Sequence, residues 1–163
     1  MNTYINTREV AKLVREALKS EFPGTKFSVR CGTGTGSAWI SVHYTDGPRY
    51  DDVRDVTCRF EGRHFNGMTD SYDEVDNDYL CDGINVTRNI SPEAAAWAAY
   101  LIESEHGEIH LNDVICVAGV RFHVRHAWIT PDVAARQIAY QVDLRGVDLT
   151  TAVFIDYLTN PTE

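Results

Sequence analysis

The sequence predicts a single α+β domain in which about four helices pack against an antiparallel sheet. Segments whose apolar residues recur with a helical period alternate with short segments whose apolar residues recur at every second position. The chain has 163 residues, of which 44% are hydrophobic, and this suits one domain with its own core. No apolar run is long enough to cross a membrane and no signal-peptide pattern is present, so we expect a cytoplasmic protein.

The first half of the chain is predicted to form a helix, a hairpin, a second helix and a strand. Asn6 and Glu9 have the spacing of a capping box, and Pro23-Gly24 ends the first helix. The buried stripe of that helix recurs at i, i+3, i+4, i+7 and i+8: Val10, Leu13, Val14, Ala17 and Leu18. The expected strands are 27–31, 38–44 and 84–88, with the second helix after Pro48.

The second half, residues 91–163, adds a helix, a hairpin and a last helix to the first half, residues 4–90. Ser91 and Pro92 have the residue types that favour a helix N-cap and first turn, and Gly107 ends that helix. Segments 114–117 and 120–125 form the clearest hairpin, Pro131 starts the last helix, and 153–158 is strand or helix.

Two glycine-containing loops allow a structural and a functional interpretation. Residues 32–37 lack the Lys-Ser/Thr of a phosphate-binding loop and precede a strand, so they are a flexible hairpin loop or a ligand contact. Gly62 and Gly67 enclose Arg63, His64 and Asn66. This second loop either plugs the core with Phe65 and Met68 or presents those polar residues to a partner.

An acidic tract follows the second loop. Residues 64–120 contain eleven acids and one base, a charge of −10 in a chain of net charge −9. If the tract is extended, Glu74, Asp76 and Asp78 point one way at roughly 6.5 Å intervals, close to the spacing of phosphates on a nucleic-acid strand. If it is helical, only Glu74 and Asp78 share a face. The tract is a solvated surface, a partner-binding patch or, less simply, a metal site. Its residues are Asp70, Asp73, Glu74, Asp76, Asp78 and Asp82.

The strongest basic patch beyond the first helix is predicted on the outer face of the second hairpin. Val120, Phe122 and Val124 alternate with Arg121, His123 and Arg125, so the first set faces the core and the second faces solvent.

No convergent catalytic set is found in the sequence. The four cysteines contain no CxxC pair and are expected to be buried free thiols. His106 and His110 have a metal-like spacing, but Gly107 interrupts the helix between them. We therefore predict no catalytic residues, no metal and no cofactor.

Four segments in order resemble one of the large polyvalent protein-associated domains of phages and conjugative plasmids. They are residues 4–13, 22–30, 45–48 and 60–70, within a range of about 4–90. The resemblance implies a mobile-element setting, in which such domains are fused into very large proteins or stand alone and act early against host defences or assist establishment. It supplies no catalytic residues.

The leading hypothesis is a non-enzymatic interaction protein that docks its acidic surface on the basic nucleic-acid groove of a host defence complex, as anti-CRISPR and DNA-mimic proteins do. The partner is then a basic protein or nucleoprotein. The alternative is an accessory nucleic-acid-binding module that uses Arg121, His123 and Arg125. A metal-dependent enzyme is a third possibility.

Overall fold

A computed structural model describes residues 4–150 of the chain, which divide into two compact units. Unit 1 contains residues 4–44 and 50–88, and unit 2 contains residues 45–49 and 89–150. Each unit has a separate hydrophobic core. The prediction of a single folding domain is not decided by this division and stays a prediction.

Unit 1 begins with helix α1 (Thr7–Glu21), which follows a short strand β1 (Ile5–Asn6). The predicted capping box is present: the Asn6 side chain accepts hydrogen bonds from the backbone N–H groups of Arg8 and Glu9 and donates one to the Glu9 carboxylate. The apolar stripe of α1 is buried at Val10, Val14 and Leu18, as the periodicity predicts.

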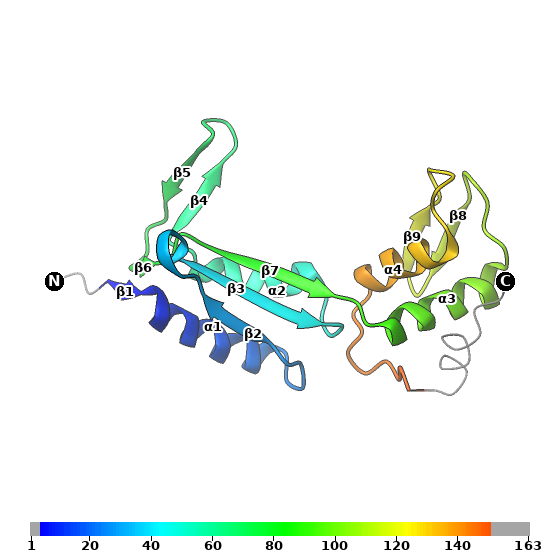
Figure 1. The fold of residues 1–163 in the computed structure, drawn as a ribbon, viewed down its shortest axis with the longest axis horizontal. Coiled ribbons are helices and arrows are strands. Elements are labelled where there is room, and N and C mark those ends of the chain that lie inside the picture. Colours follow the sequence, from blue (N-terminus) through cyan, green and yellow to red (C-terminus); the bar gives the residue numbers. More distant parts are fainter. Residues whose placement is uncertain (1–3, 151–163) are drawn as a thin grey trace. The chain divides into compact units, whose positions relative to one another are not determined.

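A three-stranded sheet in the order β2-β3-β7 forms the centre of unit 1 (Figure 1). β2 (Ser28–Cys31) and β3 (Trp39–Thr45) are antiparallel, with Ser28 opposite His43 and Cys31 opposite Ile40. The loop between them is not merely flexible, because it contains a short 3₁₀ turn, Gly34–Gly36.

β7 (Gly83–Asn89) runs in the same direction as β3 (Figure 1), so the prediction of a purely antiparallel sheet is wrong. Backbone hydrogen bonds join Asp82 to Ala38 just before both strands and Asp46 to Asn89 at their far ends. The two strands are parallel because the connection between them contains helix α2 (Tyr50–Thr57) and a 3₁₀ turn (Cys58–Phe60). This connection brings the chain back to the end of the sheet at which β3 begins.

The glycine-bracketed segment forms a second hairpin in unit 1. Strands β4 (Arg63–Asn66) and β5 (Ser71–Glu74) pair antiparallel and project from the rest of the unit (Figure 1). Met68 is 97% exposed at the turn, so the expectation that it fills the core is wrong. A two-residue strand β6 (Tyr79–Leu80) then pairs parallel with β1.

Unit 2 is built from two helices and one hairpin. Helix α3 (Pro92–His106) is capped by the Ser91 hydroxyl, which accepts from Ala94 N–H, and helix α4 (Pro131–Gln141) by Thr130. The hairpin consists of β8 (Val114–Val117) and β9 (Val120–His123) and packs on both helices. Small buried side chains let the helices approach closely: Ala98, Ala99, Ala134, Ala135 and Ala139.

The predicted α+β class is confirmed, but the described residues form four small sheets instead of one antiparallel sheet. In the β4–β5 and β8–β9 hairpins, each strand pairs only with the other strand of its hairpin. Neither hairpin extends the three-stranded sheet. No helix within residues 4–150 is long and apolar enough to cross a membrane. The expected element at 153–158 lies outside the described residues.

All four cysteines are free, as expected, but the expectation that all are buried is wrong. Cys81 is buried, whereas Cys58 and Cys116 are exposed. Cys58 lies in the 3₁₀ turn after α2, and Cys116 lies on the solvent side of β8, opposite Arg121.

Replacing Leu18 with alanine is expected to reduce the free energy of unfolding by about 2–5 kcal/mol, because its fully buried side chain leaves a cavity in the core of unit 1. Leu111→Ala is the control: because this leucine is half exposed, its replacement should reduce the free energy of unfolding by about 0.5 kcal/mol or less. Urea denaturation of both variants measures the difference, and equal losses would contradict the core assignment.

Candidate functional site

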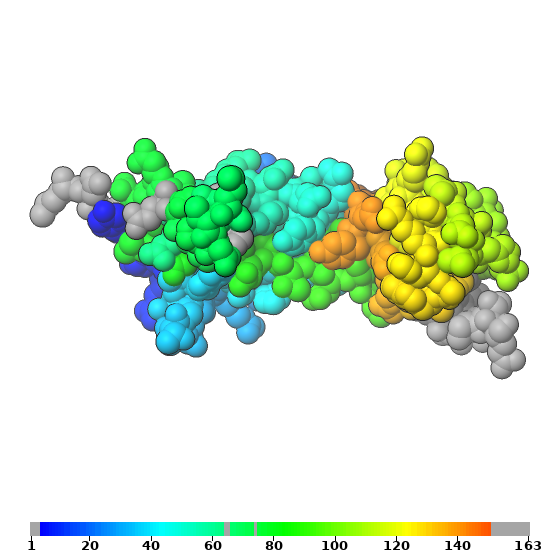
Figure 2. Space-filling view, turned by 90° about the horizontal axis from the view of Figure 1, so that it is seen from above, coloured from blue at the N-terminus to red at the C-terminus, as the bar shows by residue number. Residues whose placement is uncertain are grey.

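The acidic tract and the second glycine-containing loop that the sequence singled out lie on the β4–β5 hairpin and the segment after it. We call residues 63–82 the acidic hairpin; it contains six carboxylates and one arginine, a formal charge of −5. In the ladder Arg63 lies opposite Glu74 and His64 opposite Asp73. Figure 2 views the molecule along the direction of projection, so the hairpin (green) faces the viewer.

The turn of the hairpin is held by side-chain hydrogen bonds. The Asn66 amide donates to the Asp73 carboxylate (2.8 Å) and accepts from the backbone N–H of Met68 (3.0 Å). The hydroxyl groups of Thr69 and Ser71 lie 2.8 Å apart. These contacts fix the turn, so the thioether of Met68 is presented to solvent by an organised loop.

The carboxylates of the acidic hairpin are mostly exposed. Asp70, Asp73, Asp76 and Asp78 are open to solvent. Asp82 is half-buried, and its carboxylate lies 3.4 Å from the guanidinium of Arg63. Arg63 is therefore paired within the hairpin, whereas Asp70, Asp73, Asp76 and Asp78 form no ion pair with a described side chain.

The expected straight row of Glu74, Asp76 and Asp78 does not form. β5 ends at Glu74, and the chain bends at Asp76 and Asn77. The Asn77 side chain explains the bend, because it accepts from the backbone N–H of Tyr79 (3.0 Å) and donates to the carbonyl of Glu61 (2.9 Å). The backbone between Glu74 and Asp78 is therefore not continuously extended, so the condition for an even, phosphate-like spacing along one strand is not met.

Apolar side chains accompany the carboxylates. Tyr72 is about half exposed and contacts the Trp39 ring edge-on, with centroids 6.5 Å apart. Val75 and Leu80 are also exposed on the segment that follows. An exposed methionine and tyrosine beside carboxylates are typical of a surface that contacts protein.

The base of the acidic hairpin is fixed by a bidentate ion pair between Arg54 of α2 and Glu61. Both guanidinium NH groups of Arg54 contact the Glu61 carboxylate, and Arg54 also donates to the Ile84 carbonyl (3.1 Å). The Ile84 N–H donates to the same carboxylate (2.8 Å). Glu61 raises the pKa of Arg54 further above its ordinary value, so the guanidinium stays charged.

Gly62 allows the hairpin to start close to the neighbouring backbone. Its N–H donates to the Cys81 carbonyl (2.7 Å), and its carbonyl accepts from Val75 N–H (3.0 Å). A Cβ at this position would lie 2.1 Å from the carbonyl oxygen of Tyr79, so only glycine fits.

The predicted basic patch in unit 2 has the expected geometry. Arg121, His123 and Arg125 are exposed, while Phe122 and Val124 are buried. The sequence reading missed Trp128, an exposed aromatic residue that stacks on His126 just beyond this patch.

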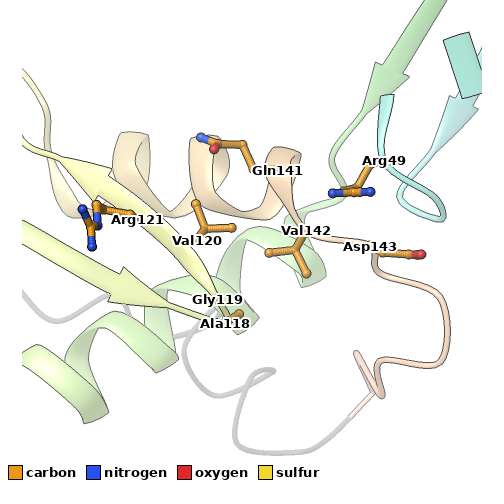
Figure 3. A pocket seen from close by; sticks show the side chains of 8 residues that line it. All are labelled: Arg49, Ala118, Gly119, Val120, Arg121, Gln141, Val142 and Asp143. Atoms are coloured by element: carbon orange, nitrogen blue, oxygen red, sulfur yellow. The ribbon is translucent and has the colours of Figure 1, made fainter. Parts of the chain in front are cut away.

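Unit 2 also has an open depression of about 470 Å³ between the β8–β9 turn and the C-terminal end of α4 (Figure 3). Val120 and Val142 lie at its centre, and Arg121 and Arg49 lie at opposite ends. Because the two guanidinium groups do not converge on one point, the depression is not arranged to hold a single anion. Its lining residues are Arg49, Ala118, Gly119, Val120, Arg121, Gln141, Val142 and Asp143.

Among the side chains that the structure describes, no three His, Cys, Asp or Glu residues are placed to hold a metal ion. His106 is the last residue of α3, and Gly107 follows with a positive φ of 69°. The helical spacing of His106 and His110 is therefore broken, as the sequence predicts. The His106 ring instead lies 3.1 Å from the Cys116 carbonyl.

Comparison with known proteins places the chain in a class of domains that accompany large polyvalent proteins. The match covers residues 5–105, more than half of the chain, and the chain belongs to the family "large polyvalent protein associated domain 29". Domains of this kind are found in polyvalent proteins of phages and plasmids, which fits an origin in a mobile genetic element. Searches of the curated proteins and of the solved structures found no match.

The matched range confirms the predicted family and extends it. The resemblance covered residues 4–90, whereas the match continues to residue 105 and includes nearly all of α3. It contains the whole acidic hairpin and both residues of the Arg54–Glu61 ion pair. The β8–β9 hairpin and α4 lie beyond it.

Replacing Glu61 with glutamine should destabilise the protein by about 1–2 kcal/mol, because Arg54 loses its anionic partner while still partly buried. The value is modest since the Arg54 side chain is 36% exposed. Hydrogen exchange should also quicken at Gly62 and Val75. Asp132→Asn, which removes the exposed Arg136–Asp132 pair, is the control, and identical behaviour of the two variants would refute the anchoring role.

The four thiols should differ in reactivity. Burial raises the pKa of Cys81 to about 11, so at about pH 8 the group is protonated and roughly a thousandth of it is thiolate. A disulfide reagent should therefore modify the exposed Cys58 and Cys116 in the folded protein and Cys81 only after denaturation. If the folded Cys81→Ser variant had one fast-reacting thiol fewer than the native protein, the expectation would be wrong.

Proposed function

We propose that this chain is a non-enzymatic interaction protein of a mobile genetic element, and that it docks the acidic hairpin on a basic protein surface. The observation that carries the proposal is the projecting hairpin, with Met68 97% exposed at its turn and exposed carboxylates along it. Leaving an apolar side chain in water at an ordered turn is more easily explained if a partner covers it.

Charge favours a basic partner. The acidic hairpin carries −5, and opposite charge on a partner accelerates association and selects among partners. The same field repels nucleic acid and anionic lipid from this surface. Met68 and Tyr72 would contribute apolar contact at the centre, with the carboxylates around them.

The basic partner is, in this proposal, the nucleic-acid-binding groove of a host defence complex. Membership of a family associated with phage and plasmid proteins supports the setting, and the charge of the hairpin supports the type of surface. Inhibition would follow from occupancy, since a groove filled by the hairpin cannot hold its nucleic acid. The bend of the backbone at Asp76 and Asn77 favours docking by shape and overall charge over imitation of a regular phosphate row.

A triple variant, Asp73→Asn, Asp76→Asn and Asp78→Asn, should lose at least tenfold in affinity for the partner captured from nuclease-treated bacterial lysate, because three exposed charges are removed without loss of volume. Excess duplex DNA should release the partner from the native protein if both use one groove. Met68→Ala should weaken capture while leaving the salt dependence unchanged.

The matched control changes three exposed carboxylates of unit 2 by the same charge: Glu103→Gln, Glu105→Gln and Glu108→Gln. This variant should capture the partner as the native protein does. Equal losses of affinity in both triple variants would mean that the net charge of the chain, and not the acidic hairpin, determines binding of the partner. Capture that neither DNA nor the hairpin variant disturbs would refute docking through the acidic hairpin.

A further inference from the structure

Unit 2 presents an exposed aromatic ring in a fixed position. Trp128 is 63% exposed and stacks on His126, with ring centroids 5.5 Å apart and planes inclined by 7°. The loop backbone is fixed by hydrogen bonds from Ile129 N–H to His126 and from Thr130 N–H to Trp128. One face of the indole is therefore supported by imidazole, and the ring is held in place for a flat partner.

A row of two arginines with a histidine between them leads along β9 towards this ring. Pairing with the neighbouring strand continues past His123, because Val124 N–H donates to Asp113 and Asn112 N–H donates to Val124. Arg121, His123 and Arg125 therefore point to the solvent side at intervals of about 6.5 Å. The Arg125 guanidinium donates to the His123 ring (3.3 Å), which confirms that the two share one face.

The surroundings leave this row positive. No Asp or Glu occurs between Asp113 and Asp132. Elsewhere in unit 2, Arg136 pairs with Asp132 and Arg145 with Asp143, whereas Arg121 and Arg125 have no carboxylate partner among the described residues. In Figure 2 the segment around residues 120–130 (yellow) forms an uninterrupted part of the face of unit 2 towards the viewer.

We propose that this surface, formed by Arg121, His123, Arg125, His126 and Trp128, binds single-stranded nucleic acid. An exposed base would stack on the free face of Trp128, and the phosphates of the neighbouring nucleotides would lie against Arg125 and Arg121. An exposed aromatic ring beside the arginines of one strand face is the combination that binds single strands, since every base has a π face and every nucleotide a phosphate.

Duplex nucleic acid fits this surface less well. The faces of its bases are covered by their neighbours in the stack, so Trp128 would gain nothing from it. An acidic peptide would satisfy the arginines but leave the indole uncovered. The site lies on a different unit from the acidic hairpin and does not depend on the function proposed for that hairpin.

The probe is a fluorescently labelled oligo-dT of about 12 nucleotides, titrated with the full chain at low salt and followed by anisotropy. Native protein should bind it, and a duplex of the same length should bind more weakly. Trp128→Ala should weaken binding about fivefold or more, and Trp128→Tyr should recover most of the loss because the stacking surface is kept. Since Trp128 is largely exposed, neither change should lower the thermal stability.

The double variant Arg121→Ala, Arg125→Ala should reduce the slope of log K against log salt by about 1.4, or about 0.7 for each phosphate that is no longer neutralised. The matched control, Arg136→Ala, removes an arginine already paired with Asp132 and should leave binding within about twofold of native. The triple variant of the acidic hairpin should retain binding to oligo-dT.

Three results would overturn the proposal: no binding of oligo-dT by the native protein at low salt, equal affinity of Trp128→Ala and the native protein, or a duplex that binds as tightly as the single strand. Displacement of the oligonucleotide by oligo-glutamate at equal charge concentration would also overturn it, since the surface would then recognise acidic protein.

Discussion

The arrangement of unit 1 depends on the ion pair between Arg54 and Glu61. It joins the end of α2 to the start of the acidic hairpin, and both residues also hydrogen-bond the backbone of Ile84 in β7. One pair of side chains therefore connects a helix, a strand and a hairpin. With only 11% of the Glu61 side chain exposed, these contacts are shielded from competition by water. The hairpin can project because its base is fixed at this point and by the close backbone approach at Gly62.

Local patterns predicted the elements whose structure is decided locally. The stripe of α1, the Ser91–Pro92 start of α3 and the alternation in β9 each specify one buried face, and all three are found. The direction of β7 relative to β3 was not predictable in this way. It depends on which distant strand β7 joins, and alternation within a strand is the same in parallel and antiparallel pairs.

The site was predicted less completely, for a related reason. The acidic residues were identified from composition, but Met68 and Trp128 are single apolar residues among polar neighbours, and a single residue has no period that reveals which way it points. The Arg54–Glu61 pair joins residues on either side of a helix end, where helical spacing no longer applies. The charge of the acidic hairpin likewise depends on geometry, because Arg63 pairs with Asp82 and not with the exposed Asp70, Asp73, Asp76 or Asp78.

The short segment 45–49 has a consequence for how the chain can be divided. It belongs to unit 2 although both of its neighbours in sequence belong to unit 1. Asp46 is hydrogen-bonded to Asn89 and Ser91, and Gly47 to Leu144. A fragment that ended at residue 88 would leave the Asp46 N–H without its acceptor and the Gly47 carbonyl without its donor. A single cut between Arg88 and Asn89 therefore does not separate the two units, because the chain passes between them more than once.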